Sequence, residues 1–204
     1  MLNSFIAIVA SYLLGSVSFS VLIAKWVKGI DIRQHGSGNA GATNTLRVLG
    51  KGPGIAVLAL DVAKGILAVW LGYWFGSGSI WVPILCGALA ITGHNWPIWF
   101  RFKGGKGIAT TIGVMATLAF WPALYAGVIA IASIALTRYV SLGSLIFAAL
   151  MPVFIALLGM RIELLIVSLV ICVYAFVRHR SNIAKLVKGQ ENKLGAGKEA
   201  PNGK

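Results

Sequence analysis

The chain has 204 residues, of which 58% are hydrophobic and only 11% are charged, and its formal net charge is +13. Soluble domains carry about 25% charged residues, so the composition excludes an ordinary soluble domain and indicates a polytopic membrane protein. Both cysteines, Cys86 and Cys172, lie in apolar runs, where a buried thiol is expected rather than a disulfide or a metal ligand.

Apolar segments follow one another along most of the chain and predict an all-α membrane helix bundle. We expect a single domain over residues 1–194, followed by a disordered polar tail, 195–204. No basic region precedes the first apolar segment, and the first cation, Lys25, follows it, which indicates a membrane helix rather than a signal peptide. The apolar segments cover residues 2–24, 55–75, 80–92, 108–136, 140–158 and 162–177.

The long segment 108–136 decides the number of membrane crossings. Pro122 lies near its middle and can either kink one helix or open a second one. A turn at 121–122 gives seven transmembrane helices, with the N-terminus outside and nearly all Lys and Arg on the cytoplasmic side. The charge distribution therefore predicts seven helices, or five if one hairpin is re-entrant, with the C-terminus in the cytoplasm.

Two charged residues interrupt the second apolar segment. Asp61 and Lys64 share one helical face through their i,i+3 spacing. They can form an internal ion pair that lowers the cost of membrane insertion, or they can support a functional site from behind. His94, in a turn that follows the third segment, leaves the same choice between an interfacial residue and a supporting one.

The first polar motif, residues 35–47, predicts an anion-binding loop. It contains a literal G-x-G-x-x-G, but no strand precedes it, so a dinucleotide-binding fold is excluded. Its glycines can bring backbone N–H groups close to an anion, although a plain glycine-rich linker is the alternative. The polar and glycine candidates are Gly36, Ser37, Gly38, Asn39, Thr43 and Asn44, together with Arg47 as a bidentate phosphate partner.

The second and third polar motifs are also basic. Residues 101–110 form a glycine-rich basic turn before an apolar segment, where free N–H groups and the helix dipole favour phosphate, although an ordinary positive-inside loop is the alternative. Residues 178–191 could simply bind anionic headgroups, but such binding would not require the residue types found there. The candidates are Lys103, Gly104, Gly105, Lys106 and Gly107 in the second motif and His179, Asn182 and Glu191 in the third.

Metal-dependent chemistry is not expected. The chain has only five acidic residues, three histidines and two cysteines, and their spacing fits neither a magnesium site nor a zinc site. The H-x₄-D signature of acyl-CoA-dependent acyltransferases is missing as well. We therefore expect no metal, no cofactor and no nucleic-acid partner.

Together the three motifs resemble those of the bacterial acyl-phosphate-dependent glycerol-3-phosphate acyltransferases, the PlsY type. The resemblance rests on GSGNAGATNTLR, GHNWPIWFRFKGGKGIAT and RHRSNIAKLVKGQENKL, in this order, and extends over residues 1–194. Lys185 departs from it, because arginine is more usual there, and lysine lacks the planar fork of arginine.

The resemblance implies a reaction and its partners. Acyl phosphate and glycerol 3-phosphate would give lysophosphatidic acid and inorganic phosphate, without a metal, at the cytoplasmic face of the bacterial inner membrane. Membrane lipids are further expected partners, and the oligomeric state is left open. A membrane transporter or a binder of phosphate esters is the alternative, but transporters tend to show internal repeats and polar groups at mid-membrane. This sequence shows no obvious repeat, its polar groups gather at one membrane face, and Asp61/Lys64 is the only charged pair within an apolar segment.

The resemblance also suggests a role for each motif. We assign Gly36, Ser37, Gly38, Asn39, Thr43 and Asn44 to the acyl phosphate, and Arg47, Lys103, Gly104, Gly105, Lys106 and Gly107 to glycerol 3-phosphate. The expected catalytic group is Ser37, Arg47, His179, Asn182 and Glu191, with Asp61, Lys64 and His94 behind it. Two hypotheses for the general base stay open: a phosphate oxygen of the donor, or His179 oriented by Glu191.

Overall fold

The computed structural model describes residues 1–195, so the predicted disordered tail lies outside the described residues apart from its first position. Within this range every regular element is a helix, which confirms the all-α prediction. The helices are α1 (Leu2–Gly15), α2 (Phe19–Lys28), α3 (Ala42–Leu49), α4 (Lys51–Phe75), α5 (Trp81–Asn95), α6 (Ile108–Leu118), α7 (Phe120–Thr137), α8 (Val140–Leu157), α9 (Ile162–Arg178) and α10 (Arg180–Val187), with two 3₁₀ turns, η1 (Ile32–Gln34) and η2 (Ile98–Phe100).

Four helical stretches are long and apolar enough to cross a membrane: the α1–α2 stretch, α4, α7 and α8. A fifth is reached if α9 and α10, which meet at a bend of 63°, are counted as one span. The helix α6 is apolar but has only 11 residues. Large apolar side chains such as Leu157 and Val170 are exposed on the outside of the bundle, as expected where lipid surrounds it. The predicted number of seven crossings stays a prediction.

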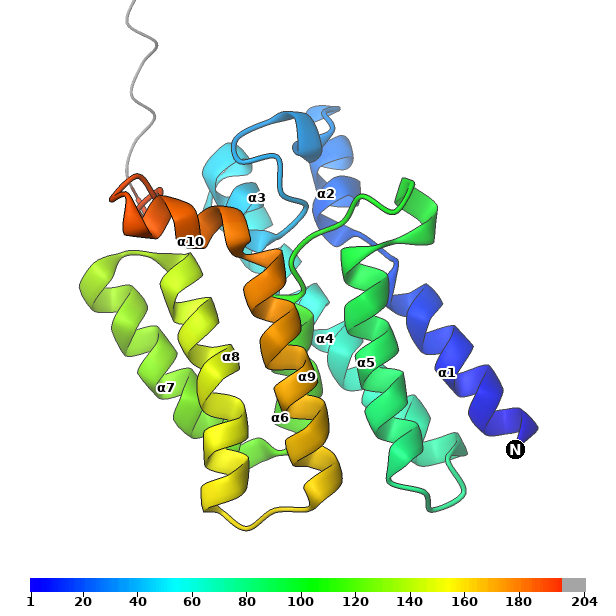
Figure 1. The fold of residues 1–204 in the computed structure, drawn as a ribbon. Helices are drawn as coiled ribbons and strands as arrows, with labels where there is room; N and C mark the ends of the chain where they lie inside the picture. The colour runs from blue at the N-terminus through cyan, green and yellow to red at the C-terminus, as the bar shows by residue number, and fades with distance from the viewer. Residues whose placement is uncertain (196–204) are drawn as a thin grey trace, which may run out of the picture.

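The segment 108–136 forms two helices, α6 and α7. The break lies at Ala119, whose backbone leaves the helical region (φ −148°, ψ 70°), rather than at the predicted 121–122. Pro122 falls in the first turn of α7, where the missing N–H of proline leaves no intrahelical hydrogen bond unmade. The chain reverses direction at this break (Figure 1).

The first apolar segment is also interrupted, at residues 16–18 between α1 and α2. We expected one helix over 2–24. The carbonyl of Val17, freed by the break, accepts a hydrogen bond from Lys64 Nζ of α4 at 2.8 Å. The buried lysine therefore supplies the partner that a broken helix lacks inside a membrane.

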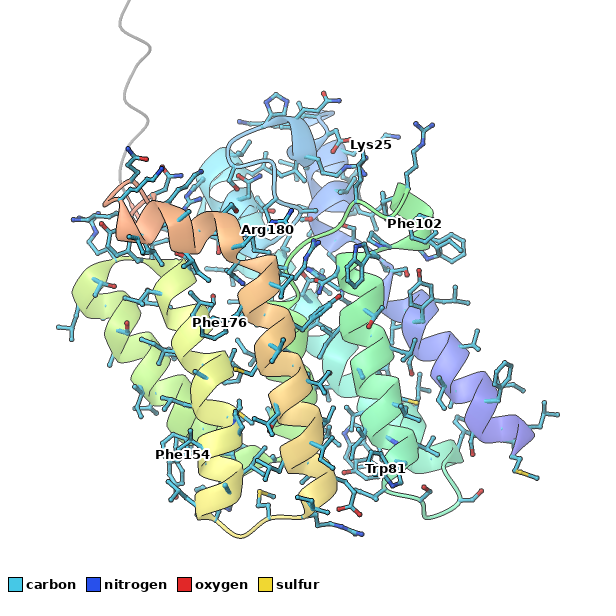
Figure 2. The ribbon with its side chains drawn as sticks, viewed as in Figure 1. Lys25, Trp81, Phe102, Phe154, Phe176 and Arg180 are labelled. Atoms are coloured by element: carbon cyan, nitrogen blue, oxygen red, sulfur yellow. The ribbon has the colours of Figure 1, made fainter. Side chains whose placement is uncertain are left out.

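All three polar motifs lie at the same end of the bundle (Figure 1). The helices α2, α3 and α10 and the connection between α5 and α6 gather there, whereas the N-terminus lies at the opposite end. Lys25, Phe102 and Arg180 mark the loop end in Figure 2, and Trp81 and Phe154 lie toward the other end. This arrangement brings residues far apart in the sequence into one polar region.

Small residues allow the central helices to approach closely. A Cβ atom on Gly65 of α4 would overlap the carbonyl oxygen of Thr110 in α6, and one on Gly113 of α6 would overlap that of Val62 in α4. Helices in membranes commonly use small residues in this way, because close backbone contact replaces the hydrophobic effect as the source of attraction. The α4–α6 contact fixes where α6 begins relative to the polar loops.

Candidate active site

A cavity of about 720 Å³ opens beneath the gathered loops and continues between the helices. Its polar end is lined by α3, α10 and the loops, and its apolar arm by α4, α6, α7 and α8. Most predicted site residues line it: Ser37, Gly38, Asn39, Thr43, Asn44, Arg47, Gly104, Lys106, Gly107, His179, Asn182 and Glu191, with Asp61 and His94. Of the remaining candidates, Gly36, Lys103, Gly105 and Lys64 do not line it.

The first motif is shaped by Asn44. Its amide nitrogen donates to the carbonyls of Ile32 (3.2 Å) and His35 (2.9 Å), and its Oδ1 accepts from the backbone N–H of Ser37 at 2.8 Å. Gly36 lies so close to this amide that a Cβ atom would overlap Oδ1, and its φ is +61°. Asn44 therefore has its amide engaged in the loop, which makes it a scaffold rather than the free phosphate donor that we expected.

The loop leads directly into α3, with Gly41 as its N-cap. The first N–H groups of a helix have no intrahelical partner, and Ala42 and Thr43 of this turn line the cavity. The dipole and the free N–H groups at the start of a helix favour an anion. Arg47, on the next turn, also lines the cavity and donates from Nη2 to the carbonyl of Asn192 at 3.2 Å.

The second motif forms a tight loop that ends at the N-terminus of α6. Gly107 is the N-cap of α6 and has a φ of +84°, which favours glycine. Gly105 donates from its backbone N–H to the carbonyl of His94 at 3.1 Å. Lys103 is exposed and does not line the cavity, so of the two predicted lysines only Lys106 lies in the site.

Lys106 carries the positive charge of the second motif into the cavity. Its Nζ donates to Oδ1 of Asn182 in α10, which joins the second and third motifs. Burial lowers the pKa of Lys106 to about 8, and the nearby Glu191 carboxylate opposes that shift. The ammonium group is therefore mostly charged at neutral pH and loses its proton within the range of ordinary enzyme assays.

Glu191 orients Asn182 rather than His179. Its Oε1 accepts hydrogen bonds from Asn182 Nδ2 at 2.8 Å and from Ser141 Oγ at 3.1 Å. The imidazole of His179 instead donates from Nδ1 to the carbonyl of Ala175 at 2.8 Å, because its position just after α9 brings it over that carbonyl. One of the two hypotheses gave Glu191 the role of orienting His179; in this structure the Ala175 carbonyl of α9 holds the ring instead.

This contact defines the chemical state of His179. With the proton on Nδ1, the neutral ring keeps Nε2 as a hydrogen-bond acceptor. His179 is 3% exposed, and burial at the end of α9 is the main reason that its pKa falls to about 4. His179 is thus neutral at physiological pH in the free protein.

Behind the second motif lies a buried ionic network. Lys64 Nζ is 2.7 Å from Asp61 Oδ1 and 3.1 Å from His94 Nδ1, and all three residues are almost fully buried. A Cβ atom on Gly105 would overlap the other ring nitrogen of His94. The predicted ion pair is therefore present, and the His94 ring that belongs to the same network lies against Gly105 of the second motif.

Two arginines that we did not single out hold the loops together. Arg33 forms a bidentate pair with Asp31, including a contact of 2.7 Å, and donates from Nη1 to the carbonyl of Phe100 at 2.9 Å, linking the first loop to η2. Arg178 donates to the carbonyl of Gly105 at 2.7 Å and lies over the Trp96 ring. The Asp31-x-Arg33 pair was visible in the sequence as one of very few acid–base neighbours, but its distant carbonyl partner was not.

Removing the Arg33 side chain should loosen both loops together. Hydrogen bonds to a charged group contribute about 1.5–3 kcal/mol each. For Arg33→Ala we expect amide hydrogen exchange in residues 35–41 and 98–104 to accelerate about ten- to hundredfold, measured by mass spectrometry in detergent or nanodiscs. Arg101→Ala, at an exposed neighbouring position, is the matched control. Faster exchange in the first loop alone would mean that the loops are held independently.

Comparison with known proteins gives a consistent picture. Residues 5–189 match the family described as glycerol-3-phosphate acyltransferase. Curated relatives of that name include those of Halalkalibacterium halodurans (54% identical, covering 94% of this chain and 96% of that protein) and Shouchella clausii (55% identical, 96% and 98%). A crystal structure of PlsY (YgiH), described as an integral membrane glycerol 3-phosphate acyltransferase in its glycerol 3-phosphate form, superposes with a TM-score of 0.88 at 38% identity over 94% of this chain and 96% of that one. Its lysophosphatidic acid form superposes with a TM-score of 0.85.

Proposed function

The chain belongs to the glycerol-3-phosphate acyltransferase family, and we propose that it transfers a fatty acyl group from acyl phosphate to the sn-1 hydroxyl of glycerol 3-phosphate. The products are lysophosphatidic acid and inorganic phosphate. One observation carries the proposal: a single cavity joins a cationic polar end, suited to phosphate groups, to an apolar arm between membrane helices. Both substrates carry a phosphate, and one also carries a fatty chain.

The polar end has the groups that two phosphates require. Arg47, Lys106 and Lys185 line it, as do the first turns of α3 and α6. We assign the acyl phosphate to Ser37, Gly38, Asn39 and Thr43 at the start of α3, and glycerol 3-phosphate to the side of Lys106 and Gly107 at the start of α6. Arg47 faces the same space and serves both. Lys103, which is exposed, contributes only long-range attraction.

The apolar arm supports a membrane-embedded acyl donor. Ile55 of α4 and Ile131 of α7 both line the cavity although they are 63% and 68% exposed, so the arm opens sideways toward the surroundings of the helices. A donor that resides in the bilayer can then bring its chain in laterally while its phosphate stays at the polar end.

The chemical step requires the loss of a proton from the glycerol hydroxyl. The hydroxyl oxygen attacks the acyl carbonyl carbon, the bond from that carbon to the phosphate oxygen breaks, and the proton passes either to a phosphate oxygen or to Nε2 of His179. Burial lowers the pKa of His179 to about 4, so the imidazole is a weak base in the free protein. This weak basicity supports the substrate-assisted route, in which a phosphate oxygen of the donor accepts the proton. The site then contributes positioning and stabilisation of charge.

The role of His179 can be tested by His179→Gln, which keeps a hydrogen-bonding group but cannot take up the proton. A general base contributes about 10²–10⁴-fold to the rate. On the substrate-assisted route we expect kcat to fall by less than about tenfold, with a larger effect on KM. A loss of a hundredfold or more in kcat, in a protein with unchanged thermal unfolding, would assign the base to His179.

Lys106 should give glycerol 3-phosphate binding a distinct pH dependence. Because the pKa of Lys106 is lowered to about 8, its positive charge is complete well below pH 8 and is lost as pH rises through that value. We expect kcat/KM for glycerol 3-phosphate to decline above pH 8, since this ratio reports the ionisation of the free enzyme. In Lys106→Arg the decline should move beyond the assay range, because arginine stays protonated. An unchanged pH profile in Lys106→Arg would show that Lys106 does not cause the decline. If the variant changes the KM for acyl phosphate and not the KM for glycerol 3-phosphate, the acyl phosphate lies at Lys106 and glycerol 3-phosphate at the start of α3.

For the membrane arrangement we propose seven crossings, by α1, α4, α5, α6, α7, α8 and α9, in the bacterial inner membrane. Two features support this: the chain reverses at the α6–α7 break, and the basic motifs share one end of the bundle, opposite the N-terminus (Figure 1). The positive-inside rule then places that end, and the active site, in the cytoplasm.

The proposed activity is tested directly with purified protein in lipid, supplied with acyl phosphate with and without glycerol 3-phosphate, in the presence of EDTA. We expect phosphate release that depends on glycerol 3-phosphate, formation of lysophosphatidic acid, and no reaction with acyl-CoA. Saturable binding of phosphate esters without turnover would instead favour a binding protein or transporter. Turnover with acyl-CoA would overturn the proposed donor.

A further inference from the structure

One face of α7 lines the apolar arm and carries an unusual glycine. The residues on this face are Ala123, Gly127, Ala130, Ile131 and Ile134, at helical spacing. A Cβ atom on Gly127 would meet no heavy atom within 4 Å. Gly65 and Gly113, by contrast, lie against a neighbouring backbone that a Cβ atom would overlap.

The usual reasons for a glycine do not apply at position 127. The residue lies inside a regular helix, without the positive φ that favours glycine. No neighbouring helix lies close enough to require the absence of a side chain. Glycine in a helix interior costs about 0.5–1 kcal/mol relative to alanine, so the position carries a cost without a packing benefit. What the glycine leaves is open space within the arm.

We propose that Gly127 is a specificity determinant that keeps the deep part of the arm open for the far end of a long acyl chain. The inference rests on the proposed acyltransferase function and adds to it the residue that sets chain length. Substitution by a larger side chain would fill this space and shorten the arm, while leaving its polar end intact.

The dimensions of the arm fit this role. From Ile134 near the polar end to Ala123, eleven residues of helix span about 16 Å, close to the half-thickness of a bilayer core of about 30 Å. The arm can therefore take an acyl chain of the length found in membrane lipids. Ala123 marks its deep end, because it is 7% exposed and packs in the buried cluster that includes Leu118, Ala119 and Met151. Gly127 lies one helical turn, about 6 Å, above that end.

The test compares a long and a short donor, hexadecanoyl phosphate and octanoyl phosphate, with Gly127→Ala, Gly127→Leu and Gly127→Phe. Each methylene that loses its place in an apolar pocket changes discrimination by about 10- to 200-fold. For Gly127→Leu and Gly127→Phe we expect the ratio of kcat/KM for the long donor to that for the short donor to fall at least tenfold. Gly127→Ala should give a smaller change in the same direction, and octanoyl transfer should stay within about threefold of wild type.

The matched control is Ala132→Leu, which introduces the same leucine side chain on an exposed part of α7 outside the cavity lining. It should leave the ratio unchanged. Thermal unfolding checks that each variant is folded, and Gly127→Ala, whose added methyl has free space, keeps the test informative if the larger variants do not fold. Stabilisation against heat by hexadecanoyl and octanoyl lysophosphatidic acid reports the same preference without turnover.

The outcomes separate this inference from the proposed function. Suppose that wild-type protein uses acyl phosphate, but that the Gly127 variants lower kcat/KM for the two donors by the same factor or leave both values unchanged. Gly127 then does not set chain length, and only this inference fails. If wild-type protein does not use acyl phosphate, the proposed donor fails, and the unfolding experiment with the two lysophosphatidic acids still decides the role of Gly127. If hexadecanoyl and octanoyl lysophosphatidic acid stabilise the protein equally, in wild type and in the variants, Gly127 does not determine chain length.

Discussion

The structure depends on Lys64, a buried charge within a membrane helix that would be costly without partners. Lys64 lies in the middle of α4, and its Nζ is surrounded by Asp61, the free carbonyl of Val17 and Nδ1 of His94. Removing one partner of a buried ion pair typically costs about 3–5 kcal/mol, because the other charge is left uncompensated. The lysine therefore holds the α1–α2 break, α4 and the end of α5 in one fixed relation.

Hydrogen bonds to the backbone connect these helices to the second motif of the site. The carbonyl of His94 accepts from Gly105, and Arg178 at the end of α9 donates to the carbonyl of Gly105. The second motif is thus held from α5 on one side and from α9 on the other, and α6 begins three residues after Gly105. Glycine is required at position 105 because the His94 ring occupies the place of a side chain. The phosphate-suited end of α6 is consequently positioned by the backbone of His94 and by Arg178, which does not line the cavity itself.

The sequence allowed the helical class, the grouping of the motifs and many of the polar residues that line the cavity to be predicted, because hydropathy and local residue chemistry are both read over short distances. Four features escaped it. The α6–α7 break lies at Ala119 and not at the predicted 121–122. The break before Phe19 goes with a contact to another helix, the Val17–Lys64 hydrogen bond. The partner of Glu191 and the role of Arg33 depend on loops distant in sequence.

Asn44 illustrates the limit most clearly. Its chemistry as a hydrogen-bonding group was predicted, but its partners are carbonyls and an N–H of its own loop, so it shapes the site instead of binding in it. The same residue type at position 182 is held between Glu191 and Lys106 at the cavity wall. The sequence identifies the side chains that could bind a phosphate. The fold determines which of them, like Asn44, instead form hydrogen bonds within the loop. Few carboxylates line this site, so an amide, that of Asn182, orients the cation Lys106. Because Lys106 is paired with no carboxylate among residues 1–195, its charge stays available for the substrate.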